Sequence, residues 1–230
     1  MATQFKSPYR DNITTDKVLN LSAKNEQGKR ASWTIRYAGN KVRLTVWTGI
    51  DGDVDNGSIN AVIDVNHFMQ FLALFEEVIH SQEKGAKVMT IRALGREGWK
   101  KPPIDKGDLY CGRNGEGVIF LSYVVPNRPK IMFPLQEDAF FMFKNKDGNP
   151  LSKQEASNIV AKGYLQTVRD IIIALTATEY VAKEDRPNPN RRKDNNNQNN
   201  QQKSSYQDDD FGGSTTTNSS DDFFSNDIDI

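Results

Sequence analysis

Residues 32–47, SWTIRYAGNKVRLTVW, consist of two runs rich in β-branched and aromatic residues on either side of Gly39 and Asn40. Gly and Asn tolerate the positive φ that a two-residue hairpin turn requires. The segment therefore predicts an antiparallel hairpin. Counting outward from the turn sets the register and places Arg36 directly opposite Arg43.

Alternation along the two strands sorts the side chains onto two faces. One face is apolar and is predicted to lie in the core: Trp33, Ile35, Tyr37, Val42, Leu44 and Val46. The other face is mostly polar: Ser32, Thr34, Arg36, Lys41, Arg43, Thr45 and Trp47.

The polar face has the residue types of a groove for single-stranded nucleic acid. Two arginines directly opposite each other repel unless they share an anion. Cations that follow the phosphates and an aromatic ring that stacks on an unpaired base are typical of such grooves. We therefore expect phosphate contacts from Arg36, Lys41 and Arg43 and base stacking from Trp47, with Thr34 and Thr45 on the same surface. The alternative is an ordinary solvated sheet face, with Trp47 buried under a long helix.

Working outward from the hairpin, the apolar pattern predicts an α+β fold of two antiparallel sheets, each followed by a helix. Strands are expected at 17–24, 30–39, 40–49 and 58–65, and then at 87–95, 108–113, 117–125 and 129–135, with residues 140–144 as an extra strand. A helix should begin at Asn66 as its N-cap. A second should begin at Ser152, which forms a capping box with Glu155, and should extend to about Val181.

A second basic and aromatic stretch lies at 95–107, where Trp99, Lys100 and Lys101 occupy a Gly- and Pro-rich loop. Loops of this kind often carry function, so these three residues are further candidates for DNA contact. Five more residues are candidates to extend the surface: Arg92, Arg113, Tyr123, Arg128 and Lys130. The aromatic run at 140–143 is expected to lie in the core or in an interface.

The charge of the chain is unevenly distributed. Lys and Arg number 30 and Asp and Glu number 30, but seven of the Asp lie in 204–230, which leaves 30 − 23 = +7 for residues 1–203. We predict a folded body at 1–183, a disordered polar linker at 184–203 and a disordered acidic tail at 204–230. A basic body with an acidic tail is typical of nucleic-acid binders whose tail competes for the same surface.

No pattern predicts an enzyme, a cofactor or a bound metal. Asp51, Asp53 and Asp55 alternate as in a calcium loop, but the required Gly and bidentate Glu are missing. The single cysteine, Cys111, is expected in the core and indicates a reducing compartment. Neither a signal peptide nor a membrane span is expected, so the predicted location is the cytoplasm.

The C-terminal residues resemble the acidic tails of bacterial and bacteriophage single-stranded DNA-binding proteins. The matching residues follow the Asn- and Gln-rich linker: Asp221, Asp222, Phe223, Phe224, Asp227, Ile228, Asp229 and Ile230. The bacterial tails end in Pro-Phe where this chain has Asp-Ile, which favours a phage-type protein, located in the host cytoplasm. The order of elements is similar to the Whirly single-stranded DNA-binding fold, and an elaborated OB-fold barrel is the alternative.

The resemblance implies a sequence-nonspecific single-stranded DNA-binding protein that coats single strands during DNA replication, recombination and repair. Its tail would recruit partner proteins of those processes and would also occupy the basic face when DNA is absent. Single-stranded RNA is an alternative target, since stacking and phosphate contacts serve both polymers. Two competing functions are a protein-interaction adaptor without DNA contact and, more remotely, a metal-dependent nuclease. The long second helix is a candidate surface for a homo-oligomer.

Overall fold

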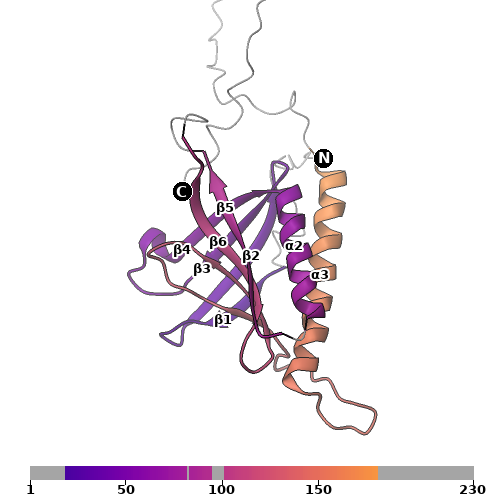
Figure 1. Ribbon diagram of the computed structural model, residues 1–230. Helices are drawn as coiled ribbons and strands as arrows, with labels where there is room; N and C mark the ends of the chain where they lie inside the picture. The colour runs from indigo at the N-terminus through magenta and orange to yellow at the C-terminus, as the bar shows by residue number, and fades with distance from the viewer. Residues whose placement is uncertain (1–18, 82, 95–100, 181–230) are drawn as a thin grey trace, which may run out of the picture.

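The computed structural model describes residues 19–81, 83–94 and 101–180. Within these residues the fold is α+β, with two antiparallel four-stranded sheets and two helices (Figure 1). The strands form two separate sheets and no closed barrel, which contradicts the alternative of an elaborated OB-fold. The predicted order of four strands, helix, four strands, helix is confirmed.

The first sheet has the strand order β1-β2-β3-β4, and its strands are β1 (Leu21–Lys24), β2 (Arg30–Ala38), β3 (Lys41–Trp47) and β4 (Ser58–Asp64). All pairs of the predicted β2–β3 hairpin are present in the predicted register. The turn residues Gly39 and Asn40 have φ values of 60° and 64°. This backbone twist matches the twist of the two strands, so the local sequence is sufficient to set the pairing.

The N-cap of helix α2 (Val65–His80) is Asp64, two residues before the predicted N-cap Asn66. Asp64 ends β4 in extended backbone, so the helix starts directly from the strand and Asn66 lies inside its first turn. The helix buries one apolar stripe: Phe68, Phe71, Leu72, Phe75, Val78 and Ile79. Their helical spacing places these side chains on one face of α2, which packs into the core.

The second sheet has the order β5-β6-β7-β8, with β5 (Gly85–Ala93), β6 (Ile104–Arg113), β7 (Ile119–Val124) and β8 (Phe133–Leu135). The extra strand expected at 140–144 is wrong, because only Lys144 pairs there, in an isolated bridge with Pro150. The chain reverses directly after Lys144 in a turn in which Asn145 accepts hydrogen bonds from the amides of Asp147 and Asn149. Because the chain reverses there, residues 140–144 do not pair as a strand beyond this single bridge.

Helix α3 (Lys153–Thr178) has the predicted capping box, in which Ser152 accepts from the Glu155 amide and Glu155 accepts from the Ser152 amide. It lies beside α2 (Figure 1) and packs against β7 and β8. The rings of Trp33 and Phe133, one from each sheet, lie with centroids 5.8 Å apart. One continuous apolar core therefore joins both sheets and both helices, and it contains the apolar face of the β2–β3 hairpin.

Candidate nucleic-acid interface

The outer face of the first sheet is polar and strongly basic. It is the face opposite the core, and the strand register identifies its members: Ser22, Lys24, Arg30, Ser32, Thr34, Arg36, Ala38, Lys41, Arg43, Thr45, Trp47, Ser58, Asn60, Val62 and Asp64. Five of these residues are basic and one, Asp64, is acidic, so the described face has a net charge of +4. We call this surface the basic face.

Arg36 and Arg43 lie directly opposite each other at the centre of the basic face, as predicted. On its other side, Arg43 faces Val62 of β4, so neither cross-strand neighbour of Arg43 offers a negative charge. The Nε atom of Arg36 is buried and has no hydrogen-bond partner in the described part of the chain. The two opposed guanidinium groups repel each other, and an anion bound between them at the surface would relieve this repulsion.

Trp47 lies on the same face, at the end of β3, and 46% of it is exposed. The alternative in which a helix buries this ring is therefore wrong, because α2 and α3 pack on the core side of the sheets. Its cross-strand neighbours, Ser32 and Ser58, are small and leave the ring uncovered. Thr45 is anchored by a 2.8 Å hydrogen bond to Asn60, and Thr34 lies opposite it.

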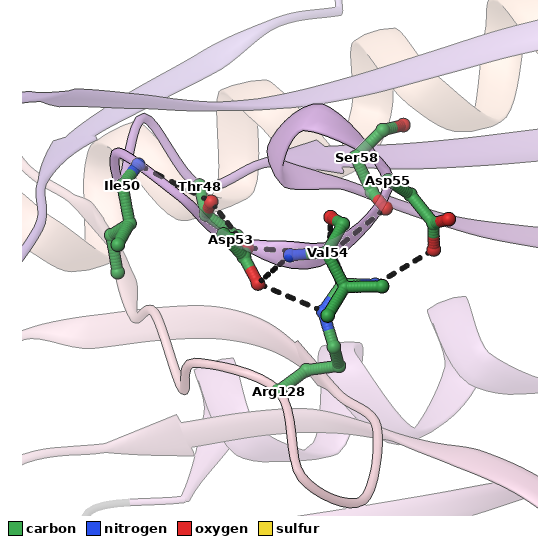
Figure 2. A network of polar contacts seen from close by, with 7 residues as sticks. All are labelled: Thr48, Ile50, Asp53, Val54, Asp55, Ser58 and Arg128. Carbon is green, nitrogen blue, oxygen red and sulfur yellow. Dashed lines mark hydrogen bonds and ion pairs between the residues drawn. The ribbon is translucent and has the colours of Figure 1, made fainter.

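The loop that follows Trp47 is held by a dense polar network (Figure 2). This loop includes the short 3₁₀ helix η1 (Val54–Gly57) and connects β3 to β4. The Thr48 hydroxyl donates to Asp53 at 2.7 Å, and the amide of Val54 donates to the other carboxylate oxygen of Asp53 at 2.8 Å. The side chain of Asn25 donates to the carbonyl of Thr48 at 2.8 Å.

Arg128, in the loop between β7 and β8, connects the second sheet to this network (Figure 2). Its guanidinium donates to both oxygens of Asp53 at 3.2 and 3.3 Å, to Asp55 at 3.2 Å, and to the carbonyls of Val54 and Ser58 at 2.8 and 3.1 Å. The side chains of Arg128 and Asp53 are only 10% and 6% exposed. Arg128 thus fixes the loop between β3 and β4 from the opposite sheet.

The pKa of Asp53 lies below its ordinary value, although burial acts to raise it. The hydrogen bond from Thr48 and the hydrogen bonds and charge of Arg128 favour the ionised form and outweigh the burial. Asp53 is therefore ionised, and its hydrogen bonds stabilise the loop. Asp51 forms an ion pair with Lys29 at the surface. The described residues contain no cluster of three or more His, Cys, Asp or Glu side chains that could hold a metal ion.

The remaining predicted contacts are placed differently. Lys101 is exposed, whereas Trp99, Lys100 and the whole of 181–230, including the acidic and apolar residues at 221–230, lie outside the described residues. Arg113 and Tyr123 are buried and cannot extend the surface. Arg92 pairs with Asp105, and Lys130 lies over the ring of Tyr110, 5.0 Å from its centroid.

Two further expectations concern the core. The Cys111 thiol is buried as predicted, and burial raises its pKa to about 12, so it is no nucleophile at neutral pH. The aromatic run at 140–143 does not lie in the core, because Phe140 and Phe141 are 93% and 45% exposed. A loop that reverses at Asn145 gives these rings no second layer to cover them.

Sequence reasoning missed the role of Arg128 and of the loop between β3 and β4. The sequence pattern places Asp51, Asp53 and Asp55 only in a turn, and it places Arg128 on an extended binding surface. The one usable signal is the acidic loop itself, because clustered carboxylates favour a nearby cation. Nothing in the sequence indicates which of the 30 basic residues supplies it.

Comparison with protein-family models, curated proteins and solved structures finds no match for this chain. Among the described residues, no helix combines the length and the apolar character needed to cross a lipid bilayer.

Proposed function

We propose that this protein binds single-stranded DNA, largely without regard to sequence, through the basic face of its first sheet. The observation that carries the proposal is the pair Arg36 and Arg43, which lie directly opposite each other with no acidic residue directly across from either in the described part of the chain. They share this surface with the half-exposed ring of Trp47. Arg43 and Trp47 are four residues apart on β3, about 14 Å at roughly 3.4 Å per residue. A nucleic-acid strand lying along β3 would contact both.

The roles follow from the chemistry of the side chains. Arg36, Lys41 and Arg43 bind phosphates and release condensed counterions, which supplies sequence-independent affinity. Trp47 stacks on a base, and stacking tolerates any base because each has a π-face. The same contacts would accept single-stranded RNA, which is the alternative target.

Two four-stranded antiparallel sheets, each followed by a helix, have the element order of the Whirly single-stranded DNA-binding fold. We propose a phage-type protein of the host cytoplasm that acts in replication, recombination and repair, and whose acidic residues at 221–230 recruit partner proteins. The exposed rings of Phe140 and Phe141 favour a second candidate, a protein-interaction adaptor that makes no DNA contact.

Mobility shift with a labelled dT oligonucleotide at low salt tests the proposal. We expect the wild type to shift the strand, Arg43→Glu to weaken the shift by charge reversal, and Trp47→Ala to weaken it about tenfold, since stacking contributes roughly 1–3 kcal/mol per base. Lys146→Glu and Phe140→Ala are matched controls, because they make the same kinds of change in the exposed segment before α3.

The controls should bind as the wild type does. No shift by the wild type at low salt would overturn the proposal and favour the adaptor. Equal loss in the control variants would show that the basic face has no special part in binding. Cleavage of the strand only after Mg²⁺ is added would instead support a nuclease.

A further inference from the structure

A shallow hollow of about 390 Å³ lies at the end of β3, beside the ring of Trp47. Its other lining residues all belong to the loop between β3 and β4: Gly49, Ile50, Asp51, Gly52, Asp53 and Asn56. The volume is within the range of about 300–1,000 Å³ typical of small-molecule sites. The hollow continues the row of outward-facing residues along β3 that begins with Lys41 and Arg43.

The chemistry of the lining changes sharply from that of the basic face. No Lys or Arg is among the lining residues, and the polar ones are two carboxylates and an amide. Because no cation lines the hollow to bind a phosphate, the sugar–phosphate backbone should stay on the side of Arg36 and Arg43. An aromatic ring beside hydrogen-bond acceptors suits a flat heterocycle with N–H donors on its edge.

The loop around the hollow is held in shape before any ligand binds. Arg128 clamps Asp53 and Asp55, and Gly49 and Gly57 have φ values of 65° and 79° that other residues rarely adopt. A Cβ on Gly49 would lie 2.4 Å from the carbonyl oxygen of Arg30. Such preorganisation lowers the conformational cost of binding.

Of the two carboxylates, only Asp51 is available to a ligand. Both oxygens of Asp53 already accept hydrogen bonds, from Thr48 and Val54 respectively, and both also accept from Arg128. Asp51 is exposed, and its ion pair with Lys29 uses one of its two oxygens. Asp51 can thus accept from the edge of a base that stacks on Trp47.

We propose that this hollow is a nucleobase subsite that prefers guanine, within the DNA binding proposed above and resting on it. Guanine presents two adjacent donors, N1–H and the N2 amino group, to a carboxylate. Thymine presents one N–H between two carbonyl oxygens, which a carboxylate repels. Trp47 supplies the stacking platform, Asp51 reads the donor edge, and Arg128 is a positioning residue that holds the loop.

Three labelled 12-mers test the subsite: alternating d(GT)6, alternating d(IT)6, in which inosine lacks only the N2 amino group, and dT12. Fluorescence anisotropy in lithium salt keeps the guanine strands unstructured. We expect the wild type to bind d(GT)6 about fivefold more tightly than d(IT)6, because the missing amino group removes one hydrogen bond that contributes roughly 1 kcal/mol. It should bind dT12 most weakly.

Asp51→Asn should bring the d(GT)6 to d(IT)6 affinity ratio close to one. Asp147→Asn, the same charge change in the turn before α3, should keep the wild-type ratio. The ratio is the readout, because loss of any negative charge near DNA raises the affinity for all three strands together. Melting temperatures of both variants equal to that of the wild type would show that the folds are intact.

The outcomes separate the subsite from the proposed function. Equal affinity of the wild type for the three strands, with binding still weakened in Arg43→Glu, overturns the subsite and leaves DNA binding in place. An unchanged ratio in Asp51→Asn also overturns it. Failure of all three strands to bind at low salt overturns the subsite and the proposed function together.

Discussion

The guanidinium of Arg128 donates to both carboxylate oxygens of Asp53, a residue 75 positions earlier in the chain, at 3.2 and 3.3 Å. Asp53 belongs to the loop that ends the basic face, and Arg128 belongs to the loop between β7 and β8 of the other sheet. The pair therefore couples the integrity of the candidate interface to the packing of the two sheets.

Removal of Arg128 should destabilise the fold. Arg128→Ala leaves the nearly buried carboxylate of Asp53 without its cation, and breaking a buried pair in this way costs about 3 kcal/mol. We expect a lower free energy of unfolding in urea titrations. Arg92→Ala is the matched control, because its ion pair with Asp105 is exposed and such pairs contribute about 0–1 kcal/mol. Equal losses in the two variants would contradict the structural role of Arg128.

The stability contributed by Asp53 should depend on pH. The pKa of Asp53 is lowered in the folded protein, despite burial, by the hydrogen bond from Thr48 and by Arg128. The contribution is therefore present above the unfolded-state pKa of about 3.9 and is lost as the pH falls through the lower folded value. We expect the difference in unfolding free energy between wild type and Asp53→Asn to shrink from about pH 5 downward. Urea titrations between pH 7 and pH 3 measure it, and a difference constant over that range would refute the assignment.

Backbone geometry in the loop between β3 and β4 should restrict substitution at Gly49. An alanine there must adopt a φ of 65° and place its Cβ 2.4 Å from the carbonyl oxygen of Arg30. We therefore expect the free energy of unfolding to fall by more than about 2 kcal/mol. Gly52→Ala, at a φ of 76° with open space around its Cβ, should cost only roughly 1 kcal/mol of backbone strain. Thermal unfolding of the pair separates the steric clash from the strain, and similar losses would show that the close approach to Arg30 is unimportant.

DNA affinity should fall with salt in proportion to the phosphates that the basic face neutralises. Three phosphate contacts, from Arg36, Lys41 and Arg43, predict that the logarithm of the DNA association constant falls with the logarithm of the salt concentration with a slope of about −2. Arg43→Ala should make that slope shallower by about 0.7. Anisotropy titrations over a series of NaCl concentrations measure it, with Lys146→Ala as the control. A slope unchanged by Arg43→Ala would show that Arg43 does not contact a phosphate.

The acidic tail is a candidate competitor for the basic face. Deletion of 204–230, which removes seven Asp and no Lys or Arg, should tighten DNA binding at low salt, because the tail and the phosphates carry the same charge. Replacement of the seven Asp by Asn in the full-length chain should have the same effect and keeps the chain length constant. Unchanged affinity of both proteins in fluorescence titrations would argue against competition.

Local signals predicted the first sheet more accurately than any other part. The β2–β3 register followed from Gly39 and Asn40, and the sorting of the faces followed from alternation, so Arg36, Arg43 and Trp47 were placed on one surface. The capping box at Ser152 was likewise readable within four residues. The predicted N-cap Asn66 was off by two residues, because β4 and α2 join without a connecting loop.

Long-range placement was not predictable in the same way. Arg113, Tyr123 and Arg128 were candidates to extend the binding surface, but the strands on or near which they lie are apolar on both faces, so alternation could not assign their side chains to one face. In the folded chain Arg113 instead donates to the carbonyls of Val78 and Ser81 at the end of α2, at 3.3 and 2.9 Å. Such contacts depend on how the two sheets and helices dock, which alternation within a strand does not encode.

The sequence by itself determined the α+β element order, the pairing of the central hairpin and the identity of its basic face, because turn geometry and two-residue periodicity act between near neighbours. Only the tertiary structure decided that Trp47 stays half exposed, that Arg128 holds the loop beside it, and that a hollow forms at the end of β3. Each of these features requires segments distant in the chain to meet, and their positions are set by the packing of one shared core.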